Sequence, residues 1–119
     1  TNGSCIKTHN GQVTIYNSTL ATCDTYGVNA VAGNTLVKNT IVTEAATAGL
    51  IGSIHGSSSN NSINQAVEFF DSYYGDFRLK NTDTIAKDAG VNLSADTIIA
   101  VTDDFTSAVR AGTWDIGAT

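Results

Sequence analysis

The 119-residue chain contains no methionine and no proline, and only 14% of its residues are charged. Globular proteins average about 25% charged residues, so Asn, Ser, Thr and Gly supply most of the polar surface of this chain. The six Lys and Arg residues are scattered, and the formal net charge is −5. Because nucleic acids and anionic membranes bind focused positive patches, this composition argues against both as partners.

Long apolar runs and targeting segments are also missing from the sequence. No run approaches the roughly 20 apolar residues of a membrane-spanning helix, and no stretch has the pattern of a signal peptide. The chain begins at Thr1 without a methionine. We therefore expect a processed product or a piece of a longer protein, with a length that suits one small domain and one core.

Cysteine is scarce: Cys5 and Cys23 are the two in the chain, eighteen residues apart. They could form a disulfide in an oxidising compartment, or remain two small buried apolar side chains. The sequence leaves both alternatives open. Because there is no Cys-x-x-Cys pair and no His/Cys cluster, a structural zinc site is not predicted.

What the chain does have is a repeat of twenty-two residues. Asn17, Asn39 and Asn61 are equally spaced, and each is followed by a hydroxyl residue. The same shift superposes Ile6, Val28 and Leu50, Gly27 and Gly49, and Gly11 and Gly33. Runs rich in β-branched residues, such as VTIYNSTL and TLVKNTIV, lie between turn-forming residues and indicate strands. The pattern predicts a parallel β-helix of about three coils, stacked at the strand spacing of about 4.8 Å.

Stacked coils would place the three asparagines above one another. Each amide has donors and an acceptor, so Asn17, Asn39 and Asn61 are expected to form a hydrogen-bonded ladder. Such a ladder would satisfy polar groups in a corner that would otherwise be costly to bury. We assign residues 1–67 to these coils.

From Glu68 onward the sequence has a different character. It contains DFRL at 76–79, AKDAG at 86–90 and WDIGA at 114–118. These motifs resemble the terminal segment of secreted right-handed parallel β-helix proteins in the pectin-lyase-like superfamily. The resemblance implies an all-β fold, a short right-handed parallel β-helix in which residues 68–119 form the last coil and an irregular C-terminal cap of the same structural domain.

The resemblance also implies which residues build the cap over the apolar end of the stack. Arg78 or Arg110 is expected to pair there with an aspartate beside a glycine. The implied cap residues are Asp76, Phe77, Arg78, Asp88, Arg110, Trp114 and Asp115.

No set of residues predicts catalysis. Asp24 and Glu44 are twenty residues apart, close to one repeat, but a turn-rich surface with isolated acids explains them better. His9 and His55 each lie in a Gly/Asn/Ser turn, and neither is part of a recognisable triad. No acidic stretch follows a calcium-binding loop. We therefore predict no catalytic residue, no metal and no cofactor.

Exposed aromatic side chains could contact sugar rings. The candidates are Tyr73, Tyr74 and Trp114, and the alternative for each is packing within the cap.

Together these features predict a non-catalytic structural module of a surface assembly, such as a phage spike, fibre or decoration protein or a bacterial surface protein. Its partners would be other protein subunits, as a homo-oligomer such as a trimer, or upstream coils of the same chain. Its location would be extracellular, on a cell surface or in a virion. One alternative is the C-terminal part of a polysaccharide lyase or glycosidase, and a second is a carbohydrate-binding adhesin with a glycan as ligand.

Overall fold

The computed structural model describes residues 3–104 and 106–118 and, within them, consists almost entirely of strands and irregular segments. This confirms the predicted all-β class. The elements in chain order are β1 (Ser4–Thr8), β2 (Gln12–Tyr16), β3 (Thr19–Leu20), β4 (Tyr26–Lys38), β5 (Ile41–Val42), β6 (Ala48–Ile54), β7 (Ser62–Ile63), β8 (Phe69–Asp71), the 3-10 helix η1 (Ser72–Tyr74) and β9 (Asp76–Leu79).

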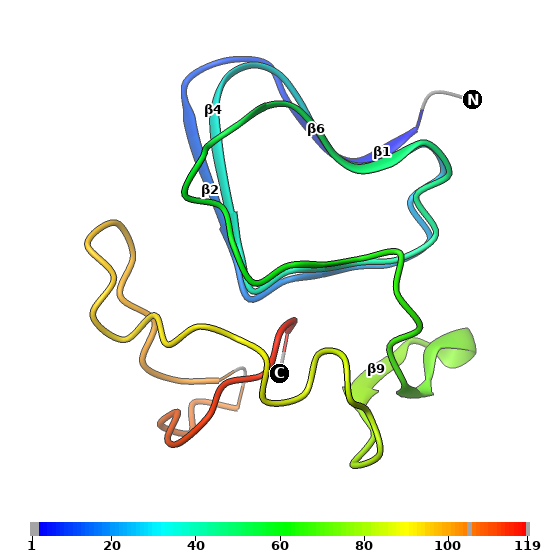
Figure 1. Cartoon of the computed structure of the whole chain (residues 1–119), viewed down its shortest axis with the longest axis vertical. Helices are drawn as coiled ribbons and strands as arrows, with labels where there is room; N and C mark the ends of the chain where they lie inside the picture. Colours follow the sequence, from blue (N-terminus) through cyan, green and yellow to red (C-terminus); the bar gives the residue numbers. More distant parts are fainter. Residues whose placement is uncertain (1–2, 105, 119) are drawn as a thin grey trace.

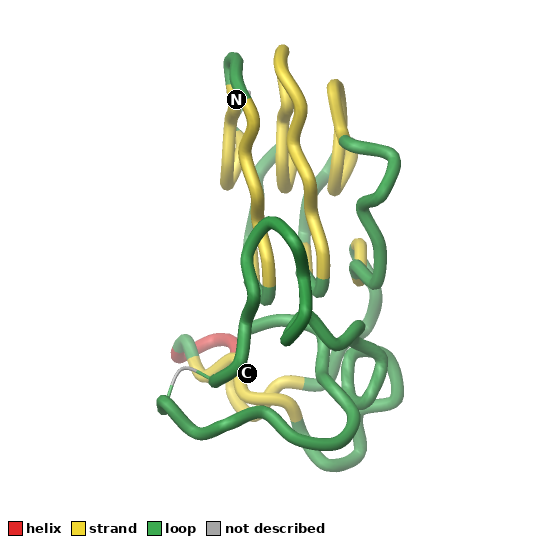
Figure 2. Tube along the Cα trace, turned by 90° about the vertical axis from the view of Figure 1, so that its left-hand side faces the viewer, coloured by secondary structure: helices red, strands yellow, loops and turns green. Residues whose placement is uncertain are grey.

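The first seven strands are stacked as three rungs. Rung 1 (residues 4–20) contains β1, β2 and β3, rung 2 (26–42) contains β4 and β5, and rung 3 (48–63) contains β6 and β7. On one side, β4 pairs in parallel with β1 and β2, and on the other side with β6, while β3, β5 and β7 form a second parallel sheet. The rungs overlie one another in Figure 1 and lie side by side in Figure 2.

The twenty-two-residue repeat is confirmed as the register between rungs 1 and 2. Ser4 pairs with Tyr26 and Gln12 with Asn34, and the remaining pairs of these two rungs keep the same offset. Rung 3 begins with that offset but then shortens, because Thr35 pairs with Ile54 after a register shift. Rungs 1 and 2 therefore have matching outlines, and rung 3 does not.

The corners of rungs 1 and 2 require a left-handed backbone at equivalent positions. Glycine and asparagine adopt this conformation most readily among the common residues, which explains the Gly and Asn matches in the repeat. The paired corner residues and their φ angles are Gly11 (78°) with Gly33 (88°), Asn17 (46°) with Asn39 (53°), and Thr22 (56°) with Glu44 (56°).

Apolar side chains of the rungs form two buried clusters. One is centred on Ile15, Val28 and Val37, and the other on Cys23, Val42 and Ala45. Two glycines of the repeat make room for this packing. A Cβ on Gly27 would lie 2.4 Å from Val42 Cγ1, and one on Gly49 would lie 2.3 Å from Ile63 Cγ2.

Replacing Gly27 by alanine should therefore destabilise the protein. The added Cβ would also lie 2.5 Å from the Gly49 carbonyl oxygen, so both a core side chain and a neighbouring strand would have to shift. Overpacking of this kind costs about 2 kcal/mol. Urea unfolding followed by circular dichroism measures the loss. Gly56→Ala is the matched control, because nothing lies within 4 Å of its added Cβ, and equal stability of the two variants would contradict this packing.

Cys5 and Cys23 are joined in a disulfide, which decides between the two alternatives that the sequence left open. Their Cα atoms are 5.2 Å apart. The bond connects β1 with the residues that follow β3, so it links the two ends of rung 1. Among the described residues, rung 1, like rung 3, has a neighbouring rung on one side only.

The segment after rung 3 contains an antiparallel hairpin of β8 and β9 and then irregular chain. It lies along the side of the stack, not across its end (Figure 2). Hydrogen bonds connect it to every rung: the Ala118 N–H donates to Thr19 Oγ1, the Gly117 N–H to the Asn39 carbonyl, and Asn60 Nδ2 to the Ala89 carbonyl. A third apolar cluster, around Ile41, Ala86 and Ile116, seals this contact.

These sheets differ from the fold implied by the resemblance to the pectin-lyase-like superfamily. The described residues form two parallel sheets and one antiparallel pair, and no closed solenoid is found among them. The short motifs behind the resemblance lie in irregular chain or in the hairpin, and two of them contact each other: Gly90 bridges Trp114, and a Cβ on Gly90 would lie 2.6 Å from the Asp115 carbonyl oxygen. The expectation of a pectin-lyase-like β-helix is therefore wrong.

Candidate functional site

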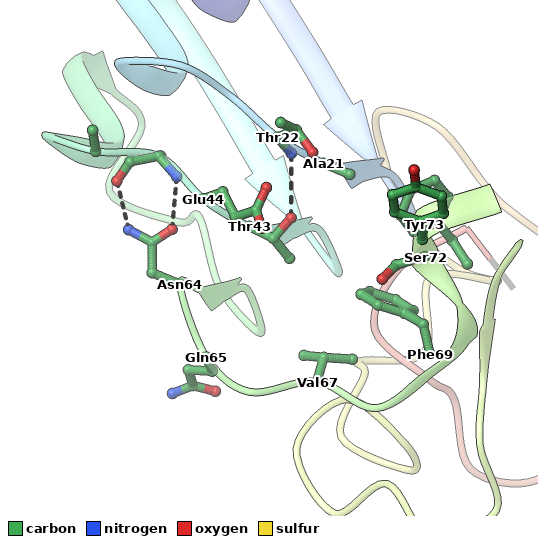
Figure 3. Close-up of a pocket in the computed structure, with 13 residues that line it drawn as sticks. Ala21, Thr22, Thr43, Glu44, Asn64, Gln65, Val67, Phe69, Ser72 and Tyr73 are labelled. Carbon is green, nitrogen blue, oxygen red and sulfur yellow. Dashed lines mark hydrogen bonds between the residues drawn. The ribbon is translucent and has the colours of Figure 1, made fainter. Parts of the chain in front are cut away.

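A groove lies between the corners of the rungs and the β8–β9 hairpin. It has a volume of about 740 Å³ and is open to solvent. Thr43 and Glu44 lie at one of its walls, Asn64 and Gln65 continue it, and the hairpin supplies the opposite side (Figure 3). The hairpin residues that line it are Phe69, Ser72, Tyr73 and Phe77.

Backbone hydrogen bonds hold the polar wall of the groove in place. The Asn64 side chain accepts a hydrogen bond from the Ala45 N–H at 2.9 Å and donates one to the Ala45 carbonyl at 2.8 Å (Figure 3). Thr43 Oγ1 accepts a bond from the Thr22 N–H at 3.4 Å. The Asn64 amide is thus committed to structure, and beside it Oε1 of the exposed Gln65 accepts a hydrogen bond from the Ser62 hydroxyl at 3.3 Å.

The aromatic wall of the groove combines a packed and an exposed ring. Phe69 and Phe77 meet edge to face, with their ring centroids 5.3 Å apart. Tyr73 is 88% exposed and contacts the Tyr74 ring in the same way, but Tyr74 does not line the groove. An exposed ring opposite amide, hydroxyl and carboxylate groups is an arrangement that can bind a ligand with one apolar and one polar face.

The three predicted sugar contacts do not come together. Tyr73 and Tyr74 are adjacent on the hairpin, but Trp114 is only 3% exposed and forms a bridge with Gly90 in the irregular segment. The guanidinium carbon of Arg110 lies 4.9 Å from the centroid of the Trp114 ring. Trp114 is therefore a packing residue.

Glu44 is the one carboxylate that lines the groove. Hydrolysis of a glycosidic bond normally uses a pair of carboxyl groups, one on each side of the bond. Asp24, the possible partner one repeat away, lies instead against Gly3. Among the described residues, the groove thus presents one carboxylate and no facing pair.

Acids near the hairpin have structural roles. Asp71 caps η1 by accepting the Tyr74 N–H, and Asp76 binds Arg78, which lowers the pKa of the Asp76 carboxyl to about 2. Asp83 is buried; burial raises its pKa, but four backbone N–H bonds together lower it below the ordinary value. His55 Nδ1 accepts the Ser57 N–H within a turn.

The expected cap residues bond within the segment after rung 3, and Asp88 does so with partners more than twenty residues away. Arg78 pairs with Asp76 rather than with Asp88 or Asp115. Asp115 accepts the Asp88 N–H at 2.8 Å, and Asp88 accepts the Thr113 hydroxyl. Phe77 packs on Phe69, and Arg110 Nε donates to the Asp103 carbonyl at 2.9 Å.

Two of the three asparagines of the repeat are bonded to each other. Asn39 Nδ2 donates to Asn17 Oδ1 at 2.9 Å, and the Asn39 side chain also exchanges two hydrogen bonds with the backbone of Val91. Asn61 is not part of this ladder: its amide bonds the backbone of Thr40 and Val37. Because rung 3 is shortened, the residue at the equivalent corner is Asn60, with φ 52°.

Sequence reasoning did not identify a half-buried polar network that holds residues 92–101 on the rungs. Asp96 accepts hydrogen bonds from Tyr16 Oη at 3.0 Å and from Lys38 Nζ at 3.1 Å. The side chains of Lys38 and Asp96 are 19% and 10% exposed. Tyr16 and Lys38 are themselves twenty-two residues apart, so the repeat could have placed them together, but nothing in the sequence indicates Asp96.

This network should make the free energy of unfolding depend on pH in the acidic range. The Ile98 N–H lowers the pKa of Asp96 most, burial opposes this, and the Ile99 N–H, Lys38 and Tyr16 lower it further, to about 2. A carboxyl group with a lowered folded pKa stabilises the protein above its unfolded pKa of 3.8, and that stabilisation is lost as the pH falls toward 2. Burial, with the Asp96 carboxylate, raises the pKa of Tyr16 to about 12.

We expect Asp96→Asn to lower the free energy of unfolding at pH 7 by about 2 kcal/mol, because it removes a charge-assisted pair. The variant should also lose part of the decrease in stability that the parent shows between pH 4 and pH 2. Urea unfolding across this range measures both effects. Asp71→Asn, at an exposed cap, is the control, and an identical acid profile for the parent and Asp96→Asn would contradict the role of the network.

The described ranges contain no group of three or more His, Cys, Asp or Glu side chains arranged to hold a metal ion. In the same ranges, no helix has the length and apolar character needed to cross a membrane.

Comparisons with protein-family models, with curated proteins and with solved structures found no match to this chain. The pectin-lyase-like assignment therefore has no support from relatives either.

Proposed function

We propose that this chain is a non-catalytic structural module of a surface assembly, such as a phage spike, fibre or decoration protein or a bacterial surface protein. The observation that carries the proposal is that acidic side chains hold the structure together. Asp83 accepts backbone N–H groups, and Asp96 pairs with Lys38. Among the described residues, Glu44 is the one acidic residue that lines the groove. A disulfide-linked rung of low charge suits an extracellular, cell-surface or virion location, with which the Cys5–Cys23 bond is compatible.

The same proposal includes the way the strands are connected into coils. Successive rungs in the twenty-two-residue register support a short right-handed stack of parallel coils, in which each rung is one coil. Other protein subunits are the proposed partners.

Incubation with a panel of neutral and acidic polysaccharides tests the absence of catalysis. We expect no new reducing ends and no unsaturated uronate products. Cleavage by the parent protein that is lost in Glu44→Gln would overturn the proposal and assign a lyase or hydrolase activity to the groove.

A second candidate function, a carbohydrate-binding adhesin, is favoured by one observation. The exposed Tyr73 ring faces a groove lined by Thr43, Glu44 and Gln65. We expect a glycan array to show binding that Tyr73→Ala abolishes and Tyr74→Ala preserves, because Tyr74 lies outside the groove. No binding by the parent, or equal loss in both variants, would remove this candidate.

A further inference from the structure

Rung 1 presents an open edge. Its strands β1, β2 and β3 pair with rung 2 on one side, and none of them pairs with another described strand on the opposite side. We call the unpaired side of residues 4–20 the rung-1 edge. An open strand edge is a template for pairing with another polypeptide.

Backbone groups point toward this edge at regular intervals. The Asn34 N–H bonds the Gly11 carbonyl, and the Asn17 N–H bonds the Lys38 carbonyl, so the odd-numbered residues of β2 face rung 2. In a parallel ladder, alternate residues direct their N–H and C=O groups to opposite sides. Thr14 and Tyr16 therefore direct theirs to the open side, where the Tyr16 carbonyl already accepts a hydrogen bond from the Ser18 hydroxyl at 2.9 Å.

Side-chain hydrogen bonding is also incomplete in rung 1. Among the described residues, two buried side-chain polar atoms have no hydrogen-bond partner, Ser4 Oγ and Asn17 Nδ2, and both belong to rung 1. Asn17 Oδ1 is bonded to Asn39 in rung 2. Because the oxygen and nitrogen of an amide diverge from the same carbon, Asn17 Nδ2 points away from Asn39. An oxygen acceptor stacked on the far side would complete the ladder.

Equivalent positions show what a further rung would cover. Val28 in rung 2 is fully buried, whereas Ile6 in rung 1 and Leu50 in rung 3 are half-buried. Leu36 is 5% exposed, and its rung-1 partner Thr14 is half-buried. Val28 has a paired rung on both sides, whereas Ile6 and Leu50 each have a paired rung on one side.

The outline of the rungs indicates which occupant fits. Rung 1 matches rung 2 at every paired position, so its open edge has the form of a regular twenty-two-residue rung. Rung 3 of a second copy would fit poorly, because its register departs from twenty-two at Ile54 and again at Ser62.

Resting on the structural role proposed above, we propose that the rung-1 edge binds an extended segment of another polypeptide. The segment runs parallel to β1 and β2 in the register of rung 2, and it places a side-chain oxygen acceptor, such as that of asparagine, over Asn17. Main-chain hydrogen bonds supply affinity, and the bond from Asn17 Nδ2 sets the register.

The probe is a synthetic, labelled peptide with the sequence of residues 24–43, since this segment already pairs with rung 1 in that register. Fluorescence anisotropy should show binding to the intact protein. Asn17→Asp keeps the acceptor for Asn39 but loses the free donor, and should weaken binding at least tenfold. Thr14→Pro removes an outward N–H and should have a similar effect. Ile51→Lys, on the opposite edge, should bind as the parent does.

A second peptide, with leucine in place of Asn39, should bind at least tenfold more weakly. No binding of the first peptide, or equal affinity for the parent and Asn17→Asp, would overturn the proposal. Self-association of the protein that Thr14→Pro abolishes would assign the edge to a second copy and overturn it as well. Cleavage of a polysaccharide would contradict the proposed non-catalytic role but would not change peptide binding. Failure of the proposed function can therefore be told apart from failure of the rung-1 edge proposal.

Discussion

Asn39→Ala is expected to lower the free energy of unfolding by about 4 kcal/mol, the largest effect of any single change proposed here. Asn39 is fully buried, and its side chain donates to Asn17 and Val91 and accepts from Val91. Its removal leaves buried polar groups of both neighbours without partners, each at a cost of about 1–3 kcal/mol. Urea unfolding at pH 7, followed by circular dichroism, measures the loss.

Asn39→Gly separates the side chain from the backbone. Asn39 has φ 53°, a conformation that glycine adopts freely and alanine does not. We expect the glycine variant to lose about 1 kcal/mol less than the alanine variant and to remain clearly less stable than the parent. If Asn39→Gly were as stable as the parent, the Asn39 amide would contribute nothing to the free energy of unfolding.

Loss of the Cys5–Cys23 disulfide should cost about 3 kcal/mol, because the bond closes a loop of eighteen residues in the unfolded chain. The double variant Cys5→Ala/Cys23→Ala should show this decrease in urea unfolding. Amide exchange should also increase first in β1, since rung 1 has one neighbouring rung.

Reductant provides the matched control. It should destabilise the parent by a similar amount and leave the double variant unchanged. Equal stability of the parent and the double variant would contradict a stabilising role, and two free thiols titrated in the unfolded, unreduced parent would contradict the bond itself.

The repeat in the sequence was sufficient to predict rungs 1 and 2. Their strands pair in parallel, so positions such as Ile6 and Val28, or Gly11 and Gly33, occupy the same environment and need similar residues. Rung 3 could not be predicted in the same way. Its shortened register moves the corner from Asn61 to Asn60, and both residues are asparagine.

The segment after rung 3 was harder to predict because its contacts are distant in sequence. Asp96 reaches Tyr16 across eighty residues, and Ala118 reaches Thr19 across ninety-nine. The motif around Asp76 reflects a local turn, which many folds share, whereas Asp115 accepts the Asp88 N–H from twenty-seven residues away. These motifs indicated a cap for the end of the stack, whereas burial of Ile41 and Ile116 holds the segment at its side.

The sequence did not predict the groove, and the role of Tyr73 as a sugar contact stays a prediction. Tyr73 was a candidate sugar contact because aromatic residues are frequent around it. Trp114, another candidate, is buried. Glu44 and Gln65 lie near Tyr73 only because the hairpin folds back on the rungs. A single sequence contains no periodic signal for that approach.

Nuclear magnetic resonance tests the central claim, the stacking of rungs 1 and 2 in a twenty-two-residue register, most directly. Interstrand nuclear Overhauser effects should connect Lys7 with Asn29 and Ile15 with Val37, and a scalar coupling should cross the hydrogen bond from the Asn34 N–H to the Gly11 carbonyl. Connections at any other offset, or antiparallel cross-peaks between β2 and β4, would contradict the stacking and the proposals built on it.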